Sequence, residues 1–184
     1  MVAGDRRCFD GGREKGGGKV GRSLRGRSGS RFHLVVDASG IPLAIEISAG
    51  NEHEQHFLLP LIDRVCAAGR SPVEVWADRG YDAARLRDQL RQRGIEPMIS
   101  KRRRAGDPIP EGTPTREVWK GRKRYRKVTD PNGRHRWPVE RTNSWLRAWR
   151  RVDTRWERRP ELWLAAIQLA AAITAYRMLE PSFR

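Results

Sequence analysis

Two apolar runs joined by a short polar turn constrain the fold of this chain more than any other feature. The runs occupy residues 32–36 and 41–47, and residues 37–40 between them read Asp-Ala-Ser-Gly. Apolar, β-branched residues on both sides of a Gly-containing turn predict an antiparallel β-hairpin. Pro42 stands near the start of the second strand, where a missing N–H is tolerated. The domain is therefore expected to be built on a sheet.

Strand and helix signals alternate along the rest of the chain. The expected elements are a helix over residues 51–68 that opens with Asn51 and Glu54 as a capping box, a strand at 73–77, a helix over 82–94 capped by Asp82, a strand at 95–99, and helices that begin at Pro138 and Pro160. Strands that alternate with helices predict an α/β (α+β) fold, in which helices cover a sheet.

The chain is expected to form one domain of four segments, because 184 residues suffice for a single core. Residues 1–31 hold a short first strand and a Gly/Arg-rich stretch, and residues 32–100 hold the hairpin, helices and a central strand. Residues 101–136 are predicted to form a basic loop or insertion, since prolines interrupt the pattern and Lys and Arg crowd it. Residues 137–184 hold the closing helices.

Net charge is the outlier of the composition. Lys and Arg total 38 against 22 Asp and Glu, which gives a formal charge of +16. Cationic side chains gain free energy by releasing the counterions condensed on nucleic acid, so the charge favours nucleic acid over a membrane as the partner. Cys8 and Cys66 match no zinc spacing. The apolar run at 162–179 contains polar residues, which favours a buried helix. A cytoplasmic, nucleoid-associated protein is expected.

Two carboxylates occupy positions where ligand sites commonly form in sheet proteins. Asp78 follows the predicted strand at 73–77, and ligand sites collect at that end of strands in open α/β sheets. Glu140 falls in the first turn of its predicted helix. The same helix face is expected to continue with Ser144, Arg147 and Arg151. A single Asp or Glu is more often a cap or a surface ion pair, so these positions alone do not identify a site.

The segments around both carboxylates resemble a known family. Residues 77–82 read Ala-Asp-Arg-Gly-Tyr-Asp and residues 139–142 read Val-Glu-Arg-Thr. They are similar to the second and third acidic motifs of DDE transposases of bacterial insertion elements. Other similar segments are a hairpin at 21–43, a loop at 50–52 and a C-terminal stretch at 150–159. The resemblance covers most of residues 8–180.

The resemblance implies a ribonuclease-H-like fold, a mixed sheet flanked by helices, with three carboxylates that converge on two Mg²⁺ or Mn²⁺ ions. Asp78 would be the second acid and Glu140 the third. The implied activity is metal-dependent cleavage and strand transfer of double-stranded DNA at element ends and targets. The alternative is a catalytically inactive remnant that binds DNA non-specifically.

The first acid has two candidates. The family places it upstream of a Lys-Gly-Gly stretch, and Asp10 precedes such a stretch at residues 15–17. Asp10 is therefore expected to be catalytic and to bind metal together with Asp78 and Glu140. Asp37 is the competitor. An Asp at the mouth of a hairpin turn, however, ordinarily bonds its own backbone.

The family's helix signature, Tyr-x2-Arg-x3-Glu-x6-Lys, assigns DNA-contacting residues. Arg136 matches its Arg, Arg147 stands where Lys is usual, and Gly133 replaces its Tyr. Pro138 is expected to keep Arg136 off the regular helix. Further DNA contacts are predicted at Arg151 and, in the basic segment, at Arg102, Arg103, Arg104, Arg122, Lys123 and Arg124.

Aromatic residues and partners complete the expectations. Trp119, Tyr125 and Trp137 are interleaved with basic residues and suit stacking on unpaired bases. Trp145 and Trp149, at helical spacing, are expected in the core. Because family members normally carry an N-terminal DNA-binding segment, a DNA-binding subunit from an upstream reading frame is an expected partner. A homo-oligomer on DNA is another.

Overall fold

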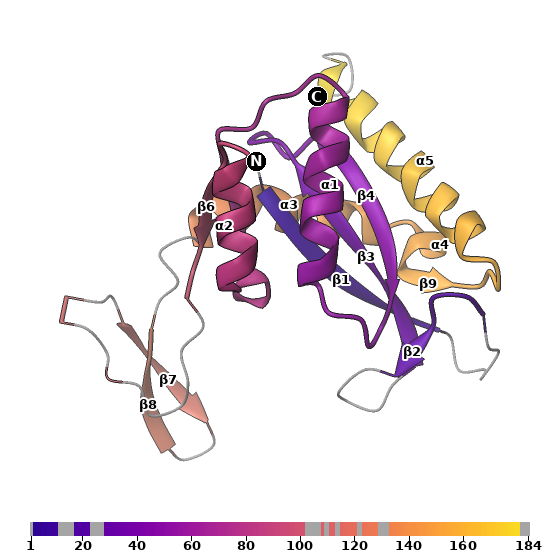
Figure 1. Ribbon diagram of the computed structural model, residues 1–184. Helices are drawn as coiled ribbons and strands as arrows, with labels where there is room; N and C mark the ends of the chain where they lie inside the picture. Colours follow the sequence, from indigo (N-terminus) through magenta and orange to yellow (C-terminus); the bar gives the residue numbers. More distant parts are fainter. Residues whose placement is uncertain are drawn as a thin grey trace.

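The computed structural model has a mixed α/β fold with a seven-stranded sheet, a separate two-stranded sheet and helices (Figure 1). The strands are β1 (Val2–Asp10), β2 (Gly21–Arg22), β3 (Ser28–Val36), β4 (Pro42–Ala49), β5 (Glu74–Ala77), β6 (Glu96–Ile99), β7 (Thr115–Lys120), β8 (Lys123–Val128) and β9 (Thr154–Arg155). The structure describes residues 2–10, 17–22, 28–101, 108, 111–112, 115–120, 123–128 and 133–180.

The large sheet combines antiparallel and parallel strands. β3 pairs antiparallel with both β1 and β4. β1 pairs parallel with β5, and β5 pairs parallel with β6. The order across the sheet is therefore β4–β3–β1–β5–β6, with β2 added to β3 and β9 added to β1. Helices occupy the connections that lead to the parallel strands, as parallel pairing requires.

The predicted hairpin is confirmed as β3 and β4, which pair from Ser30–Ala49 to Val36–Pro42. Its turn is closed by Asp37, whose Oδ1 accepts hydrogen bonds from the backbone N–H groups of Ser39 and Ile41, both at 2.9 Å. Gly40 adopts a φ of +89°, a conformation that an L side chain rarely takes. The turn chemistry read from the sequence thus forms as expected.

One face of the sheet is covered by α1 (Gln55–Ala67) and α2 (Ala84–Gln92). Both helices begin later than predicted. Of the two residues expected to form the capping box, Glu54 makes no side-chain cap hydrogen bond and instead pairs with Arg31 at 2.7 Å. Asp82 likewise pairs with Arg87 at 2.7 Å. The core on this face comprises Val35, Leu58, Leu61, Ile62, Val65, Val75, Ala77, Tyr81, Leu86, Leu90, Ile95 and Ile99.

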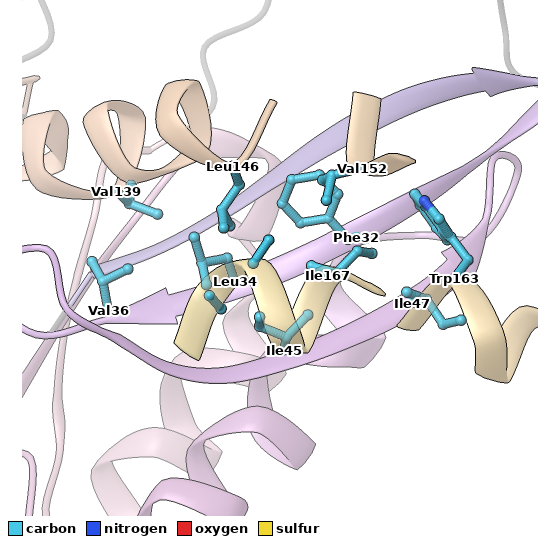
Figure 2. Close-up of a cluster of buried hydrophobic side chains, with 12 residues drawn as sticks. Phe32, Leu34, Val36, Ile45, Ile47, Val139, Leu146, Val152, Trp163 and Ile167 are labelled. Carbon is cyan, nitrogen blue, oxygen red and sulfur yellow. The ribbon is translucent and has the colours of Figure 1, made fainter. Parts of the chain in front are cut away.

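The opposite face is covered by α3 (Gly133–Arg147), α4 (Arg150–Asp153) and α5 (Pro160–Leu179). Their side chains meet the strands in a second core (Figure 2). Phe32 and Trp163 pack edge to face there, with ring centroids 6.4 Å apart. The core comprises Phe32, Leu34, Val36, Ile45, Ile47, Val139, Leu146, Val152, Trp163, Ile167, Ala170 and Ala171. Burial of apolar area on both faces is the main stabilising contribution to the sheet.

Helix α5 is long and apolar enough to cross a membrane by length and composition, with a mean hydropathy of 1.4. Core helices meet the same criterion. Trp163 and Ile167 on α5 are fully buried against the sheet (Figure 2). Leu162 and Leu169, in contrast, are more than half exposed. The helix therefore covers the sheet with one side only.

The basic segment contains a β-hairpin that the sequence pattern did not reveal. β7 and β8 pair antiparallel from Thr115–Val128 to Lys120–Lys123, and the hairpin extends away from the large sheet (Figure 1). Residues 101–136 were predicted to form a basic loop or insertion, and the hairpin is the regular structure described within that segment. Charged residues alternate there with Val118, Trp119 and Tyr125, and their density hides the strand pattern.

His33 lies inside the sheet and is held neutral. Its ring stacks on Phe57 at 4.3 Å, and its Nε2 lies 2.8 Å from Ser48 Oγ. Burial, reinforced by the positive charge of Arg31, lowers the pKa of His33 to about 3. An unfolded chain would instead titrate this imidazole near its ordinary pKa of about 6.5.

Acid should therefore destabilise the domain through His33. Between pH values of about 6.5 and 3 the unfolded state binds a proton that the folded state refuses, so the free energy of unfolding falls as pH falls. The expected loss is about 1.4 kcal/mol per pH unit. Urea unfolding between about pH 7 and pH 5 should show this slope. It should flatten in His33→Gln and persist in His53→Gln, which alters an exposed histidine.

Candidate active site

Asp78 follows β5 directly and caps the short 3-10 helix η1 (Arg79–Tyr81). Its Oδ1 accepts a hydrogen bond from the backbone N–H of Arg79 at 2.6 Å. The same oxygen lies 2.8 Å from Nη1 of Arg136 on α3, and the Asp78 side chain remains 56% exposed. An exposed carboxylate thus sits at the end of a buried strand, next to a cation from another element.

The other residues of the motif at 77–82 hold Asp78 in place. Tyr81 is buried, and its hydroxyl lies 3.5 Å from His33 Nδ1. A Cβ on Gly80 would lie 1.9 Å from Oε1 of Glu54, so only glycine leaves room for that carboxylate. The motif therefore presents the exposed acid Asp78 on a backbone that is anchored by the buried Tyr81 and the closely packed Gly80.

Helix α3 carries Arg136 and Glu140 one turn apart. The expectation that Pro138 opens this helix is wrong, because α3 begins at Gly133 and Pro138 lies inside it. A proline so close to a helix start removes a single hydrogen bond, which the helix tolerates. Arg136 is consequently helical, and Glu140 follows it on the same helix side. Glu140 is exposed.

Contacts at two points along α3 hold it over the sheet. His135 stacks on Trp76 of β5, with ring centroids 3.7 Å apart. Further along, Thr142 Oγ1 donates to the buried carbonyl of Gly40 at 2.5 Å, and Arg141 donates to the carbonyl of Ser39. These contacts bring the helix side with Arg136 and Glu140 to the edge of the sheet where Asp78 lies.

The backbone register does not bring Asp10 level with Asp78. In the parallel pairing of β1 with β5, Ala3 is opposite Ala77, the residue before Asp78. Asp10 is opposite Arg155 of β9 instead. At about 3.3 Å per residue, the strand from Ala3 to Asp10 is roughly 23 Å long. The side chain of Asp10 lies outside the described part of the chain, and its predicted role remains a prediction.

Of the acidic residues in β1, Asp5 is nearest to Asp78 in the pairing register. It lies two residues beyond Ala3, which is opposite Ala77. Sequence reasoning did not single it out, and only the pairing register points to it. Asp37, the other candidate for the first acid, uses its carboxylate to close the hairpin turn. That arrangement is the ordinary structural role expected for an Asp at this position.

The single helix face that was predicted to carry Glu140, Ser144, Arg147 and Arg151 is interrupted. α3 ends at Arg147, and Arg151 belongs to α4, so the two do not share one helix face. The break allows Val152 to enter the core. Arg147 Nε pairs with Asp153 at 2.7 Å, and Arg151 Nε lies 3.5 Å from Glu157. Both guanidinium groups are largely solvent-exposed, so each pair is weak enough for a phosphate to replace the carboxylate.

The remaining predicted DNA contacts are in the basic segment. Lys123 and Arg124 begin β8, opposite Lys120 and Trp119. Their side chains are not described, and the other four lie outside the described residues: Arg102, Arg103, Arg104 and Arg122.

Two tryptophans expected in the core are on the surface. Trp145 is 40% exposed and Trp149 is 36% exposed, while Leu146 takes the buried position. The inner face of α3 carries Val139 and Leu146, Trp145 lies on the adjacent side, and Trp149 follows the end of the helix. A helical pattern counted from Val139, and not from the tryptophans, would have predicted the buried side of the helix correctly.

The donor set suits a hard divalent cation. Asp78 and Glu140 offer carboxylate oxygens, which Mg²⁺ and Mn²⁺ prefer. Among the described side chains, no group of three or more His, Cys, Asp or Glu residues lies close enough together to hold a metal ion. Side chains of β1, the strand next to β5, are not among those described.

The chain belongs to the family described as the transposase DDE domain, whose profile matches residues 5–175. It is similar to a candidate transposase for insertion sequence element IS402 from Burkholderia cepacia, with 36% identity over 162 residues, which cover 84% of this chain and 66% of that protein. It is also similar to a transposase for insertion sequence element IS1106 from Neisseria meningitidis serogroup B, with 28% identity over 97 residues, 53% of this chain. The chain spans 32% of that second protein.

The bond between Thr142 and Gly40 should be the main polar contact that seats α3. Thr142→Val leaves the carbonyl of Gly40 buried without a donor, which typically costs about 1–3 kcal/mol. Urea unfolding should show this loss. Ser144→Ala is the matched control, because Ser144 is exposed and bonds only within its own helix, to Glu140 O at 3.1 Å. Equal stabilities of the two variants would contradict the assignment.

Proposed function

We propose that this chain carries the catalytic centre for metal-dependent DNA strand cleavage and strand transfer in the transposition of an insertion element. The observation that supports it most is the ion pair of Asp78 with Arg136 at 2.8 Å, with Glu140 one turn further along α3. It joins the two acidic motifs, distant in sequence, at one edge of the sheet. Family membership supplies the reaction class.

The sheet supports a ribonuclease-H-like fold. Its order β4–β3–β1–β5–β6 has antiparallel strands on one side of β1 and parallel strands on the other. This arrangement places the end of β5 beside β1, at the point where parallel and antiparallel pairing meet. Such an edge suits a ligand site, because acids from neighbouring strands can be presented together.

Asp78 and Glu140, with a first acid from β1, would hold two Mg²⁺ or Mn²⁺ ions. Two such ions activate an attacking hydroxyl and stabilise the leaving oxygen of an in-line displacement. Two carboxylates about 4 Å apart repel each other by about 4 kcal/mol at an effective dielectric near 20, so a site of this kind needs nearby positive charge. Arg136 supplies such charge beside Asp78.

The proposed substrate is double-stranded DNA, at the element ends and at the target. Arg136, Arg147 and Arg151 are proposed to contact its phosphates, since guanidinium groups bind phosphate oxygens in pairs. A homo-oligomer on DNA and a separate DNA-binding subunit are proposed as partners, at the nucleoid in the cytoplasm. The net charge of +16 supports the DNA partner.

Cleavage tests the catalytic proposal. Nicking of supercoiled DNA that depends on Mg²⁺ or Mn²⁺ should fall to the level without metal in Asp78→Asn and in Glu140→Gln, because each change removes a ligand charge. Asp88→Asn, at an exposed aspartate on α2, is the matched control and should leave the rate unchanged. Comparable nicking in Asp78→Asn and Asp88→Asn would refute the assignment of Asp78.

The first acid is tested in the same assay. Asp10 is proposed from the motif, and Asp5 from the register of β1 with β5. Asp5→Asn and Asp10→Asn should differ, and the variant that loses nicking identifies the acid. Asp37→Asn should retain nicking, because the Asn side-chain oxygen can still accept the two hydrogen bonds that close the hairpin turn.

An inactive DNA-binding remnant is the second candidate, and the offset of Asp10 from Asp78 favours it. Mn²⁺ binding followed by electron paramagnetic resonance separates the two. A catalytic chain should bind Mn²⁺ with a stoichiometry near two and lose it in Asp78→Asn. Absence of both Mn²⁺ binding and nicking in the unmutated chain would establish the remnant.

Duplex binding should depend steeply on salt. Neutralisation of about six phosphates gives a log–log slope of affinity against salt near −5. Replacing Arg102, Arg103, Arg104, Arg122, Lys123 and Arg124 with Gln should make the slope several units shallower. A control that replaces Arg85 and Arg91, exposed on α2, should retain the slope. Similar slopes in both variants would place the main DNA contacts elsewhere.

A further inference from the structure

A wide groove lies between α3, the turn of the β3–β4 hairpin and the C-terminal part of α5. Its volume is about 1090 Å³. Trp137, Trp145 and Trp149 line it from the side of α3, and Arg177 and Met178 line it from α5. Tryptophan is usually largely buried, yet these three are exposed by 56%, 40% and 36%. Packing of the domain does not account for them.

Two of the indoles form a row with a guanidinium between them. Arg141 Cζ lies 4.4 Å from the ring centroid of Trp137 and 4.7 Å from that of Trp145. The three residues follow each other at intervals of four along α3, so they stack on one side of the helix. A cation at this distance from an indole face is attracted by the ring quadrupole. The two indoles and the guanidinium therefore form one continuous row of planar groups along the side of α3.

The electrostatics of the groove favour an anion. Arg141 and Arg177 line it, and no Asp or Glu is among the described residues that do. Within the described structure, Nε of Arg141 is buried and has no hydrogen-bond partner. A buried donor of this kind gains free energy from an acceptor that enters the groove.

We propose that this groove binds an unpaired stretch of a DNA strand, with bases stacked on the indoles and phosphates near Arg141 and Arg177. Duplex DNA hides the faces of its bases, so only unpaired nucleotides can stack on an indole. Trp137 and Arg141 are sequence neighbours of Arg136 and Glu140, so the groove adjoins the candidate active site. The inference rests on the proposed function for the source of the strand: cleavage produces free strand ends.

Binding of a fluorescent oligothymidylate and of a duplex of equal length, both in EDTA, tests the groove without cleavage. Trp145→Ala should weaken oligothymidylate binding about tenfold, because one stacking surface is lost, and leave duplex binding within about twofold. Trp145→Tyr should restore most of the affinity. Trp156→Ala is the matched control, since Trp156 is 59% exposed beside Arg150 and lies outside the groove.

Photocrosslinking of the unmutated chain keeps the test valid if a variant fails to fold. An oligonucleotide with bromouracil should attach to a peptide that contains Trp137, Trp145 or Trp149. Attachment only elsewhere, or equal loss of both ligands in Trp145→Ala, would overturn the proposal. A change from dimer to monomer in Trp145→Ala with unchanged oligonucleotide binding would identify the groove as an interface between copies. Because binding is measured without metal, absence of nicking bears on the proposed function alone.

Discussion

Helix α3 reaches the candidate site only because it is held on the sheet at two separate points. His135 stacks on Trp76 at 3.7 Å, and the Thr142 hydroxyl bonds the Gly40 carbonyl at 2.5 Å. Val139, between these contacts, and Leu146, one turn beyond Thr142, enter the core (Figure 2). The remaining sides of the helix stay exposed. One side carries Arg136 and Glu140, and the adjacent side carries Trp137 and Trp145 of the groove.

Charge sets the second constraint on the structure. Lone carboxylates in a chain of +16 are strongly attracted to arginines, and several acids are paired in this way. Asp78 is paired too, but its side chain remains 56% exposed and the pair spans two elements. Such a pair contributes little to stability, because water screens the exposed Asp78 carboxylate. Exposure is what leaves Asp78 available to other cations.

The segment that resembles the family's C-terminal signature has a structural role here. The guanidinium of Arg155 is buried and donates to the carbonyl groups of Gly18, Glu157 and Arg158, and to Ser30 Oγ. It thereby joins an early segment of the chain to the start of α5. A buried guanidinium requires such partners, because an unpaired charge inside a protein is costly. Similarity in this segment therefore reflects folding more directly than chemistry.

The sequence by itself determined the hairpin, the short strand before Asp78 and the two acidic motifs, because each depends on neighbours a few residues away. It also identified Asp37 as a turn residue. Helix starts were misplaced where expected caps formed long-range ion pairs, as with Glu54 and Arg31. The register of β1 and the position of Arg136 against Asp78 depend on pairing between distant segments. Local patterns carry no such information, so only the tertiary structure decided which acids lie near each other and which tryptophans face solvent.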